Sequence, residues 1–244
     1  MAVAVVAGGV GAWALLSGGD TKVKAAPVRT TTSSTTTTTP VPPPATTATS
    51  KVAKIDAFES PADGAKVINS FSDKTEYGLA RTFLVTDRQP GWLHVLLPQR
   101  PNGSSGWIRE SDVTLGESHF SIKIELGGHK VTLYKDGQVV LETQAVIGKQ
   151  QTPTPLGKFY ITDPVDLQSH PSGAYGAYAL GLSGYSEVLT SFNGGPGQIA
   201  LHGTPNADQV GQDLSNGCVR IPNDVILNVV NQQPPLGTPV EIDA

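Results

Sequence analysis

Residues 130–147, KVTLYKDGQVVLETQAVI, decide the class of fold that this chain is expected to adopt. Two runs of alternating apolar and polar residues lie on either side of Asp136-Gly137. Asp-Gly between such runs is the strongest short signal for a β-hairpin, because both turn positions favour positive φ. Further elements are predicted outside this hairpin, with strands at residues 120–126 and 238–242 and a short helix at 223–230 with Asn223 as its N-cap. The pattern therefore predicts a mainly β domain, sandwich-like or barrel-like, with one or two short helices.

The composition agrees with a β architecture rich in turns. Charged residues make up only 16% of the chain, and there are 27 glycines and 19 prolines between short apolar runs. The formal net charge of −4 argues against nucleic acid as a partner. A metal site is not expected either, because the single cysteine and the histidines lack the spacing of metal ligands.

Residues 53–116 are expected to form a separate small β-barrel in front of the main domain, which spans residues 117–244. Short strands are predicted at 81–86, 92–97 and 107–109, between turn clusters rich in Gly, Pro and Asn. The repeated pair Gly91-Trp92 and Gly106-Trp107 resembles the bacterial Src-homology-like domains of cell-wall proteins, and this implies a role in wall binding. Both tryptophans are predicted to pack in the core instead of forming a ligand platform.

The first 52 residues predict export and a tether. Residues 1–20 are apolar or small with almost no charge, which is typical of a membrane anchor or signal segment. We expect an uncleaved anchor, with cleavage after Ala25 as the alternative; an upstream start codon would explain the lack of cations before the segment. Residues 21–52 are rich in Thr and Pro and are expected to be a disordered linker. The protein is therefore predicted to lie in the cell envelope, anchored to the membrane or secreted to the wall.

The chemistry is expected at the one cysteine of the chain. Cys218 lies in Ser215-Asn216-Gly217-Cys218-Val219-Arg220, sixteen residues after His202, which begins His202-Gly203-Thr204. A lone thiol in an oxidising compartment cannot form an internal disulfide, so it is either a buried inert side chain or a nucleophile. A thiolate nucleophile requires a nearby base, and His202 is the histidine that lies in a comparable motif.

At these residues the chain resembles the L,D-transpeptidase catalytic domain, the YkuD family. Its motif runs His-Gly, a variable gap, and Ser/Thr-x-Gly-Cys-Ile/Val-Arg/Asn. The resemblance extends over residues 119–244 and includes three further landmarks, the hairpin at 134–137, the turn at 154–157 and the closing strand at 237–240. Many members have a histidine where Asn216 stands, so a second imidazole cannot contribute here.

The resemblance implies an enzyme that needs no cofactor and cleaves the bond between a diamino acid and D-alanine in a peptidoglycan tetrapeptide stem. Cys218 would form a thioester with the stem, and the side-chain amine of a neighbouring stem, such as that of meso-diaminopimelate, would resolve it into a crosslink. His202 would act as general base and then as general acid. Carbapenem-type β-lactams are expected to acylate the thiol, and the protein is expected to be a monomer.

Further site residues are proposed around this pair. The backbone amides of Asn216, Gly217 and Cys218 are the candidate oxyanion hole. Residues 163–198 have little periodicity and are interpreted as a lid over the site. The remaining candidates for substrate binding or loop support are Gly203, Ser215, Arg220, Tyr175, Tyr178 and Tyr185. Arg220 is expected either to bind a substrate carboxylate or to pair with an internal acid.

Two alternatives stay open at this point. Water in place of the amine would make the protein an L,D-carboxypeptidase, and the sequence does not separate the two acceptors. A non-catalytic wall-binding protein is the alternative from another class, although a pure binding protein has no need of a Cys and His pair.

Overall fold

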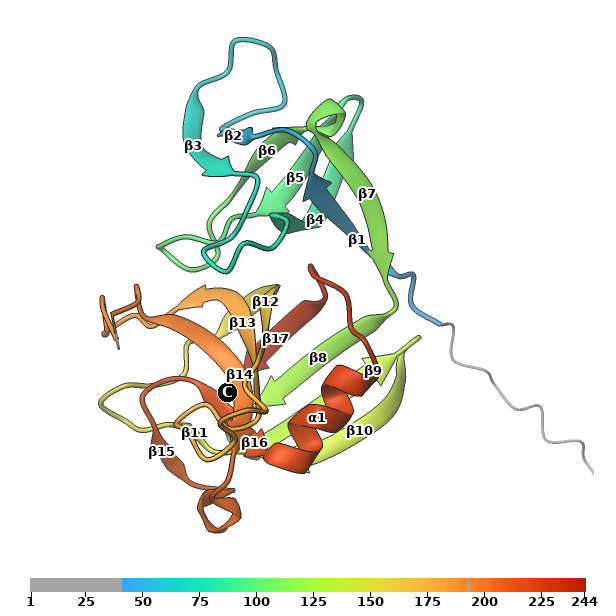
Figure 1. Ribbon diagram of the computed structural model, residues 1–244. Coiled ribbons are helices and arrows are strands. Elements are labelled where there is room, and N and C mark those ends of the chain that lie inside the picture. Colours follow the sequence, from blue (N-terminus) through green and yellow to red (C-terminus); the bar gives the residue numbers. More distant parts are fainter. Residues whose placement is uncertain (1–40, 193) are drawn as a thin grey trace, which may run out of the picture. The chain divides into compact units, whose positions relative to one another are not determined.

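Residues 41–192 and 194–244 are described by the computed structural model (Figure 1). The predicted anchor at 1–20 and most of the predicted linker lie outside the described residues. None of the helices in the described ranges has the length and apolar character needed to span a membrane.

The first sheet has seven strands in the order β3-β2-β6-β5-β4-β1-β7. Its strands are β1 (Ala45–Ser50), β2 (Lys54–Phe58), β3 (Val67–Ser72), β4 (Thr82–Gln89), β5 (Trp92–Leu96), β6 (Ser105–Arg109) and β7 (Val113–Ser118), with a 3₁₀ turn η1 (Glu110–Asp112). Trp92 is buried and packs edge-on against Phe58, with ring centroids 5.3 Å apart. Trp107 is half-buried and stacks at a tilt on His94. These contacts give both tryptophans a packing role.

Strand β1 corrects the predicted extent of the linker. It pairs with β4 on one side and with β7 on the other, and Ala48 in its centre is fully buried. The predicted disordered linker at 21–52 therefore overlaps an ordered strand. The Thr-rich composition concealed it, because β-branched threonine suits a strand whose backbone pairs on both sides as well as it suits an unfolded tether.

The second sheet has eight strands in the order β10-β9-β8-β17-β12-β13-β14-β16, and a parallel pair, β11 with β15, lies beside it. The strands are β8 (Phe120–Glu125), β9 (Lys130–Lys135), β10 (Gln138–Gln144), β11 (Ile147–Gly148), β12 (Gly157–Asp166), β13 (Tyr178–Tyr185), β14 (Gln198–Thr204), β15 (Asp213–Ser215), β16 (Val219–Pro222) and β17 (Pro239–Asp243). A 3₁₀ turn η2 (Ala207–Gln209) and one α-helix, α1 (Asn223–Asn231), complete the described part. The mainly β fold with a single short helix is confirmed.

The predicted hairpin is present between β9 and β10. Asp136 and Gly137 form its turn with φ of 51° and 73°, and Lys135 pairs with Gln138 directly after it. The predicted run after the turn, 138–147, is divided in the structure, because β10 ends at Gln144 and β11 begins at Ile147.

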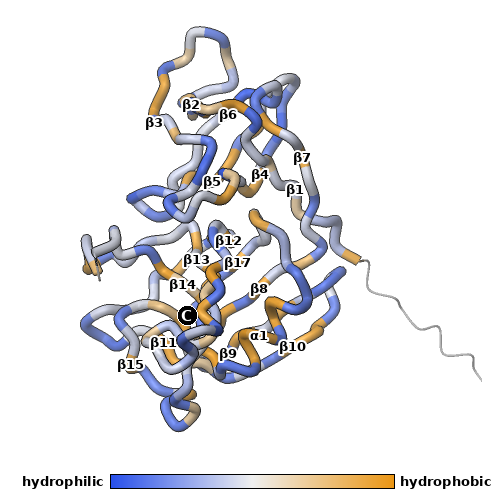
Figure 2. Tube along the Cα trace, in the orientation of Figure 1, coloured by the Kyte–Doolittle hydropathy of each residue, from blue (hydrophilic) through white to orange (hydrophobic). Residues whose placement is uncertain are grey.

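Helix α1 begins at Asn223, with Pro222 in the N-cap position and no side-chain cap. The prediction of Asn223 as N-cap was wrong, because its side chain bonds to a neighbouring loop instead. Ile226 and Val229 of α1 are buried in the core cluster with apolar residues from the sheet. The hydropathy colouring shows apolar stretches on α1 and on the strands near it (Figure 2).

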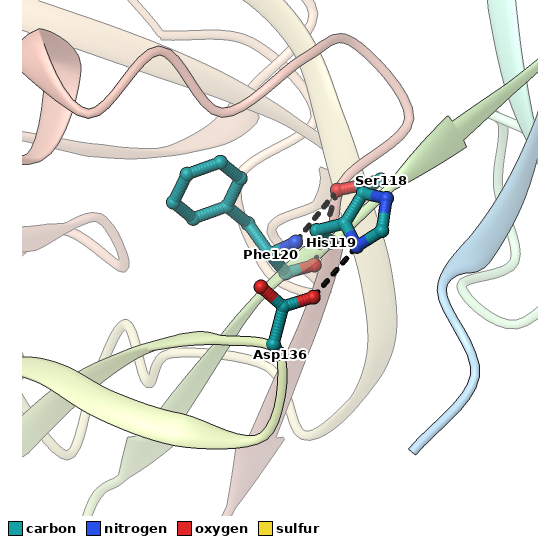
Figure 3. Close-up of polar contacts among 4 residues, drawn as sticks. All are labelled: Ser118, His119, Phe120 and Asp136. Atoms are coloured by element: carbon teal, nitrogen blue, oxygen red, sulfur yellow. Dashed lines mark hydrogen bonds and ion pairs between the residues drawn. The ribbon is translucent and has the colours of Figure 1, made fainter. Parts of the chain in front are cut away.

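Ser118 and His119 join the two sheets, between β7 and β8. The buried hydroxyl of Ser118 accepts a hydrogen bond from the Phe120 amide at 3.2 Å and lies 2.8 Å from Thr238 Oγ1. His119 Nδ1 lies 2.6 Å from a carboxyl oxygen of Asp136 (Figure 3). These bonds tie the connection to the hairpin turn and to the segment before β17, and residues 40–244 form one unit by their contacts.

The interpretation of residues 163–198 as one lid was wrong in large part. Residues 163–166 end β12, and 178–185 form β13 in the middle of the sheet. Their periodicity was obscured because β13 is buried along most of its length and therefore lacks apolar and polar alternation. Parts of the irregular segments that remain, including Tyr175, Ser186, Leu189 and Gly197, do line the site described next.

Candidate active site

Two neighbouring strands present the candidate catalytic residues on one face of the sheet. β14 and β16 run in parallel, with His202 opposite Arg220 and Leu201 opposite Val219. Leu201 and Val219 point into the core, so the alternate residues lie on the other face, because side chains alternate along a strand. His202, Cys218 and Arg220 line one pocket there. The structure therefore brings together the two residues on which the sequence interpretation depended.

The loop before Cys218 is held by the hydroxyl of Ser215. Ser215 is fully buried; its Oγ donates to the Cys218 carbonyl at 2.6 Å and accepts from the Gly217 amide at 3.0 Å. Thr152 supports the same residue by donating to the Ser215 carbonyl at 3.2 Å. Gly217 has a φ of +115°, which side-chain-bearing residues rarely adopt, so this tight turn requires glycine. The thiol is thus presented by a rigid turn.

The bond to Ser215 removes one of the three candidate oxyanion donors. The Gly217 amide already donates to Ser215 Oγ, so it does not point freely to a reacting oxygen. The amides of Asn216 and Cys218 are left as the candidate donors.

The ring of His202 is oriented by a main-chain carbonyl. Nδ1 lies 2.8 Å from the Gly203 oxygen, and since a carbonyl only accepts, Nδ1 carries the proton and Nε2 is left as the basic nitrogen. Tyr175 packs edge-on against the imidazole, with centroids 5.1 Å apart. His202 itself is only 2% exposed.

Asn223 is a supporting residue that the sequence interpretation did not assign to the site. Its Oδ1 accepts from the Ala177 amide at 2.8 Å, and its Nδ2 donates to the Pro171 carbonyl at 3.0 Å. A Cβ at Gly203 would collide with Asn223 Oδ1, so this glycine permits the close approach. Asn223 therefore fixes the loop that carries Tyr175 over His202. The sequence pattern indicated Asn223 as a helix cap but not its bonds to this loop.

Burial keeps both catalytic candidates neutral. It lowers the pKa of His202 from 6.5 to about 4, although the Gly203 and Tyr175 carbonyls act in the opposite direction. Burial also raises the pKa of the Cys218 thiol, partly offset by a hydrogen bond from the Ala200 backbone and by the charge of Arg220. At neutral pH the pocket therefore holds a thiol and a neutral imidazole.

The lowered pKa of His202 predicts an acid-tolerant reaction. The basic imidazole is lost only as the pH falls through about 4, so single-turnover acylation of Cys218 should stay nearly constant from pH 7 to pH 5 and be halved near pH 4. Intact-protein mass measured against time at each pH checks this. Half-loss near 6.5 would contradict it.

The same shift affects stability and requires a folding control. A depressed histidine pKa contributes stability that is fully present above 6.5 and is lost as the pH falls from 6.5 towards 4, because the unfolded chain then binds a proton that the native state does not. Circular dichroism at each pH separates the loss of a base from unfolding.

Arg220 is half-buried in the pocket and has no acidic partner. Its Nε is buried without a hydrogen-bond partner, and among residues 41–192 and 194–244 no carboxylate lies within ion-pair distance of its guanidinium. The internal pairing considered for Arg220 is therefore not present. The guanidinium remains available for a carboxylate that enters the pocket.

The three tyrosine candidates lie in different places. Tyr175 lines the catalytic pocket together with His202 and Cys218. Tyr178 lines a separate hollow near the end of α1 and packs against the core. Tyr185 bonds to the first sheet, donating to the Pro98 carbonyl at 3.2 Å. Only Tyr175 is therefore placed where it contacts the catalytic histidine.

Arg100, from a loop of the first sheet, binds the segment that forms one wall of the pocket. Nη2 of Arg100 lies 2.8–3.1 Å from the carbonyl oxygens of Ser186, Leu189 and Pro196, and its guanidinium packs over the Tyr185 ring. Ser186 and Leu189 line the pocket. The sequence interpretation missed this role because Arg100 lies far from these acceptors along the chain and in a turn without a motif.

Arg100 is expected to influence the reaction without contacting Cys218. Arg100→Ala should slow acylation by about 10-fold or more, because small displacements of positioning groups have large effects on rate. Arg88→Ala, which removes a surface ion pair with Glu110 in the same sheet, is the matched control and should react normally. Equal rates for both variants, measured by single-turnover mass spectrometry, would contradict the role of Arg100.

Within residues 41–192 and 194–244, no group of three or more His, Cys, Asp or Glu could hold a metal ion. The site consists of a thiol, an imidazole, a guanidinium and backbone amides, which is the equipment of nucleophilic acyl transfer.

Comparison with known proteins agrees with this site. Residues 119–242 match the L,D-transpeptidase catalytic domain, YkuD. A Bacillus subtilis (strain 168) protein named as a candidate L,D-transpeptidase, YkuD, is 31% identical over 124 residues, which cover 51% of this chain and 66% of that protein. The chain thus spans slightly less than two thirds of the length of this relative.

Two solved structures are also similar. The catalytic domain of an Enterococcus faecium L,D-transpeptidase is 26% identical and covers 50% of this chain and 95% of its own, with a TM-score of 0.37. L,D-transpeptidase 3 from Mycobacterium tuberculosis, solved with a faropenem-derived adduct, is 16% identical over 57% of this chain and 67% of its own, with a TM-score of 0.42. On the match over residues 119–242, the chain belongs to the L,D-transpeptidase family.

Proposed function

We propose that this protein is a peptidoglycan L,D-transpeptidase with Cys218 as nucleophile and His202 as general base and acid. The observation that carries the proposal is the meeting of the lone thiol and a neutral, oriented imidazole in one pocket, beside the Arg220 guanidinium, whose Nε has no hydrogen-bond partner among the described residues. Residues 119–242 match the L,D-transpeptidase catalytic domain, and on that basis we assign the tetrapeptide stem of the cell wall as the substrate class.

The reaction proceeds through a thioester. Nε2 of His202 takes the proton from Sγ of Cys218 as the sulfur attacks the carbonyl carbon between the diamino acid and D-alanine. The oxyanion that forms accepts hydrogen bonds from the Asn216 and Cys218 amides. The imidazolium then protonates the amine of the departing D-alanine, and the C–N bond breaks.

The second half of the reaction regenerates the thiol. The neutral side-chain amine of a neighbouring stem attacks the thioester carbonyl, His202 accepts a proton from it, and the C–S bond breaks with the proton returned to Cys218. The product is an amide crosslink between the diamino acids of two stems. Water in place of the amine gives the carboxypeptidase reaction.

Arg220 is the proposed carboxylate anchor. It lies opposite His202 across β14 and β16 and has no acid of its own in the described ranges. A planar guanidinium binds a carboxylate through two parallel hydrogen bonds, which fixes orientation as well as position. The stem offers such a group in its terminal D-alanine.

The catalytic pocket admits only the reacting end of the stem. Its volume is about 50 Å³, whereas an adjoining cavity of about 330 Å³ shares Tyr175, Phe192 and Gln198 with it. A water molecule needs roughly 10–15 Å³ on such a measure, so the smaller pocket holds a few waters and not a peptide. The acyl group therefore enters beside Cys218, while the rest of the stem lies in the larger cavity.

The other parts of the chain fit a role at the cell wall. The Gly-Trp repeat of the first sheet resembles bacterial Src-homology-like domains, and we assign to it wall binding in addition to its hold on the catalytic loop. The apolar segment at 1–20 and the Thr and Pro-rich segment after it suit a domain held above a membrane. Faropenem-type and carbapenem-type β-lactams are the proposed inhibitors, through acylation of Cys218.

A stem-peptide assay tests the proposal and separates the two acceptors. The protein is incubated with a tetrapeptide stem, with and without a second stem that supplies only the amine, and products are identified by mass. Crosslinked dimer with release of D-alanine supports transpeptidation. Tripeptide alone, in the presence of excess amine, would assign the carboxypeptidase reaction, and no release of D-alanine would reject both.

A further inference from the structure

A third cavity, of about 140 Å³, lies between the two sheets and contains an unusual carboxyl group. Thr75, Glu76 and Arg81 from the connection between β3 and β4, and Asp163 from β12, are among its lining residues. Five side-chain polar atoms are buried without a hydrogen-bond partner in the described ranges, and two of them, Thr75 Oγ1 and Asp163 Oδ1, belong to this lining. Unpaired buried atoms are rare in native proteins and call for an explanation.

Asp163 is the more informative of the two. It is 4% exposed, and within residues 41–192 and 194–244 no lysine, arginine or histidine lies within ion-pair distance of it. Arg81, the cation in the lining, uses its guanidinium to bond the carbonyls of Ser72 and Lys74. A buried carboxyl without a partner costs free energy, so its presence points to a group that arrives from outside.

Asp163 and Cys218 lie in one row across the sheet. Asp163 of β12 pairs with Gly181 of β13, and Gly181 pairs with Ala200 of β14. Ala200 in turn is next to Cys218, because the following residues, Leu201 and Val219, are paired. Paired residues share a face, so the row is continuous, and three strand spacings put its ends about 14 Å apart.

The two middle residues of this row extend little above the backbone, which leaves a groove. Gly181 and Ala200 carry the smallest side chains, and both line the second cavity. That cavity shares Tyr175, Gln198 and Ile199 with the catalytic pocket, and it shares Glu76, Pro196 and Gln198 with the third cavity. The three cavities therefore adjoin one another from the thiol to Asp163, and Gln198, whose amide bonds to Thr162 Oγ1 and the Leu182 carbonyl, lines each of them.

The charges at the far end favour a cationic group. Asp163 and Glu76 contribute two carboxyl groups, against the one guanidinium of Arg81, which is already engaged. A tetrapeptide stem contains several carboxylates, but its one side-chain cation is the ammonium group of the diamino acid. That group lies within the residue whose acyl carbon is attacked, at the end of a side chain that extends away from the reacting bond.

We propose that Asp163 and Glu76 bind the side-chain ammonium group of the diamino acid in the donor stem. The inference rests on the proposed function and adds a specificity determinant to it. The acceptor stem is excluded as the occupant, because its amine must be neutral and beside the thioester to react. Since Glu76 lies in the connection between β3 and β4, a loop of the first sheet and a strand of the second together form the donor site.

The test is a cycle of two substrates and two proteins in the full chain. Donor stems with a free side-chain amine and with the same amine acetylated are compared for kcat/KM of D-alanine release, with unmutated protein and with Asp163→Asn. Acetylation should lower kcat/KM by about 10- to 100-fold for the unmutated protein, the range of a buried charge-assisted bond, and have little effect on the variant. For Glu76→Gln, the effect of acetylation on kcat/KM should lie between the effects on the unmutated protein and on Asp163→Asn. Glu187→Gln, an exposed acid that lines none of these cavities, is the matched control.

Three further readouts keep the outcomes distinct. Acylation by a carbapenem, which lacks the diamino acid, should be equal for unmutated protein and Asp163→Asn; if neither protein is acylated and neither releases D-alanine, the proposed function has failed and not this inference alone. Thermal unfolding of Asp163→Asn should not fall, because no partner is lost; a large drop would indicate a structural role. Equal effects of acetylation on kcat/KM of both proteins would overturn the ammonium site in favour of bound water. A rise in melting temperature with Ca²⁺ that requires Asp163 would overturn it in favour of a metal ion.

Discussion

Replacing Cys218 with alanine is expected to abolish turnover of stem peptides, by about 10⁴-fold or more, because the variant lacks the thiol that forms the covalent intermediate. The fold should be unchanged, since alanine removes only the sulfur and the turn around residue 218 is held by Ser215. D-Alanine release measured by mass, with circular dichroism as the folding control, checks both statements.

Cys218→Ser tests whether the reaction requires the ionisable sulfur and not only the shape of the side chain. A serine hydroxyl keeps the shape and a hydrogen bond but is far less ionisable than a thiol, so a neutral imidazole beside it should not activate it well. Residual turnover with Cys218→Ala at more than a few per cent of the unmutated rate would show that Cys218 is not the nucleophile.

Replacing His202 with alanine is expected to reduce acylation by about 10²-fold or more, the range of a lost general base. Burial disfavours the thiolate and so raises the pKa of the Cys218 thiol. Without His202, this thiol would have no proton acceptor. Added imidazole should restore part of the rate if the cavity left by the side chain admits it.

His170→Ala is the matched control for this variant. His170 is exposed, bonds only to Ser169 beside it among the described side chains, and does not line the catalytic pocket. A near-normal rate in His202→Ala, or equal losses in the two variants, would mean that another group takes the proton.

The fold was predictable where local signals agree with long-range pairing. The Asp136-Gly137 hairpin needed only two turn residues and alternating flanks, and the structure has the turn at those positions. The Cys218 and His202 motifs were predictable for a related reason. Gly217 is required by backbone geometry within the motif itself, as its positive φ shows.

Other features depended on contacts that no local pattern records. Strand β1 lies in a Thr-rich segment and is ordered because β4 and β7 pair with it on both sides. Tyr178 and Tyr185 were grouped with Tyr175 because all three lie in one Gly-rich stretch, but β13 carries the first two away from the pocket. Asn223 and Arg100 act on loops that are distant in sequence, so only the folded chain reveals them.

The most direct test of an activated thiol at Cys218 is intact-protein mass after mixing with a carbapenem. The protein should begin at residue 41 and not after β1, because removal of that strand would expose both of its partners. The account predicts one covalent adduct on the unmutated protein and none on Cys218→Ala. No adduct on a folded sample, or the same adduct on both proteins, would contradict it.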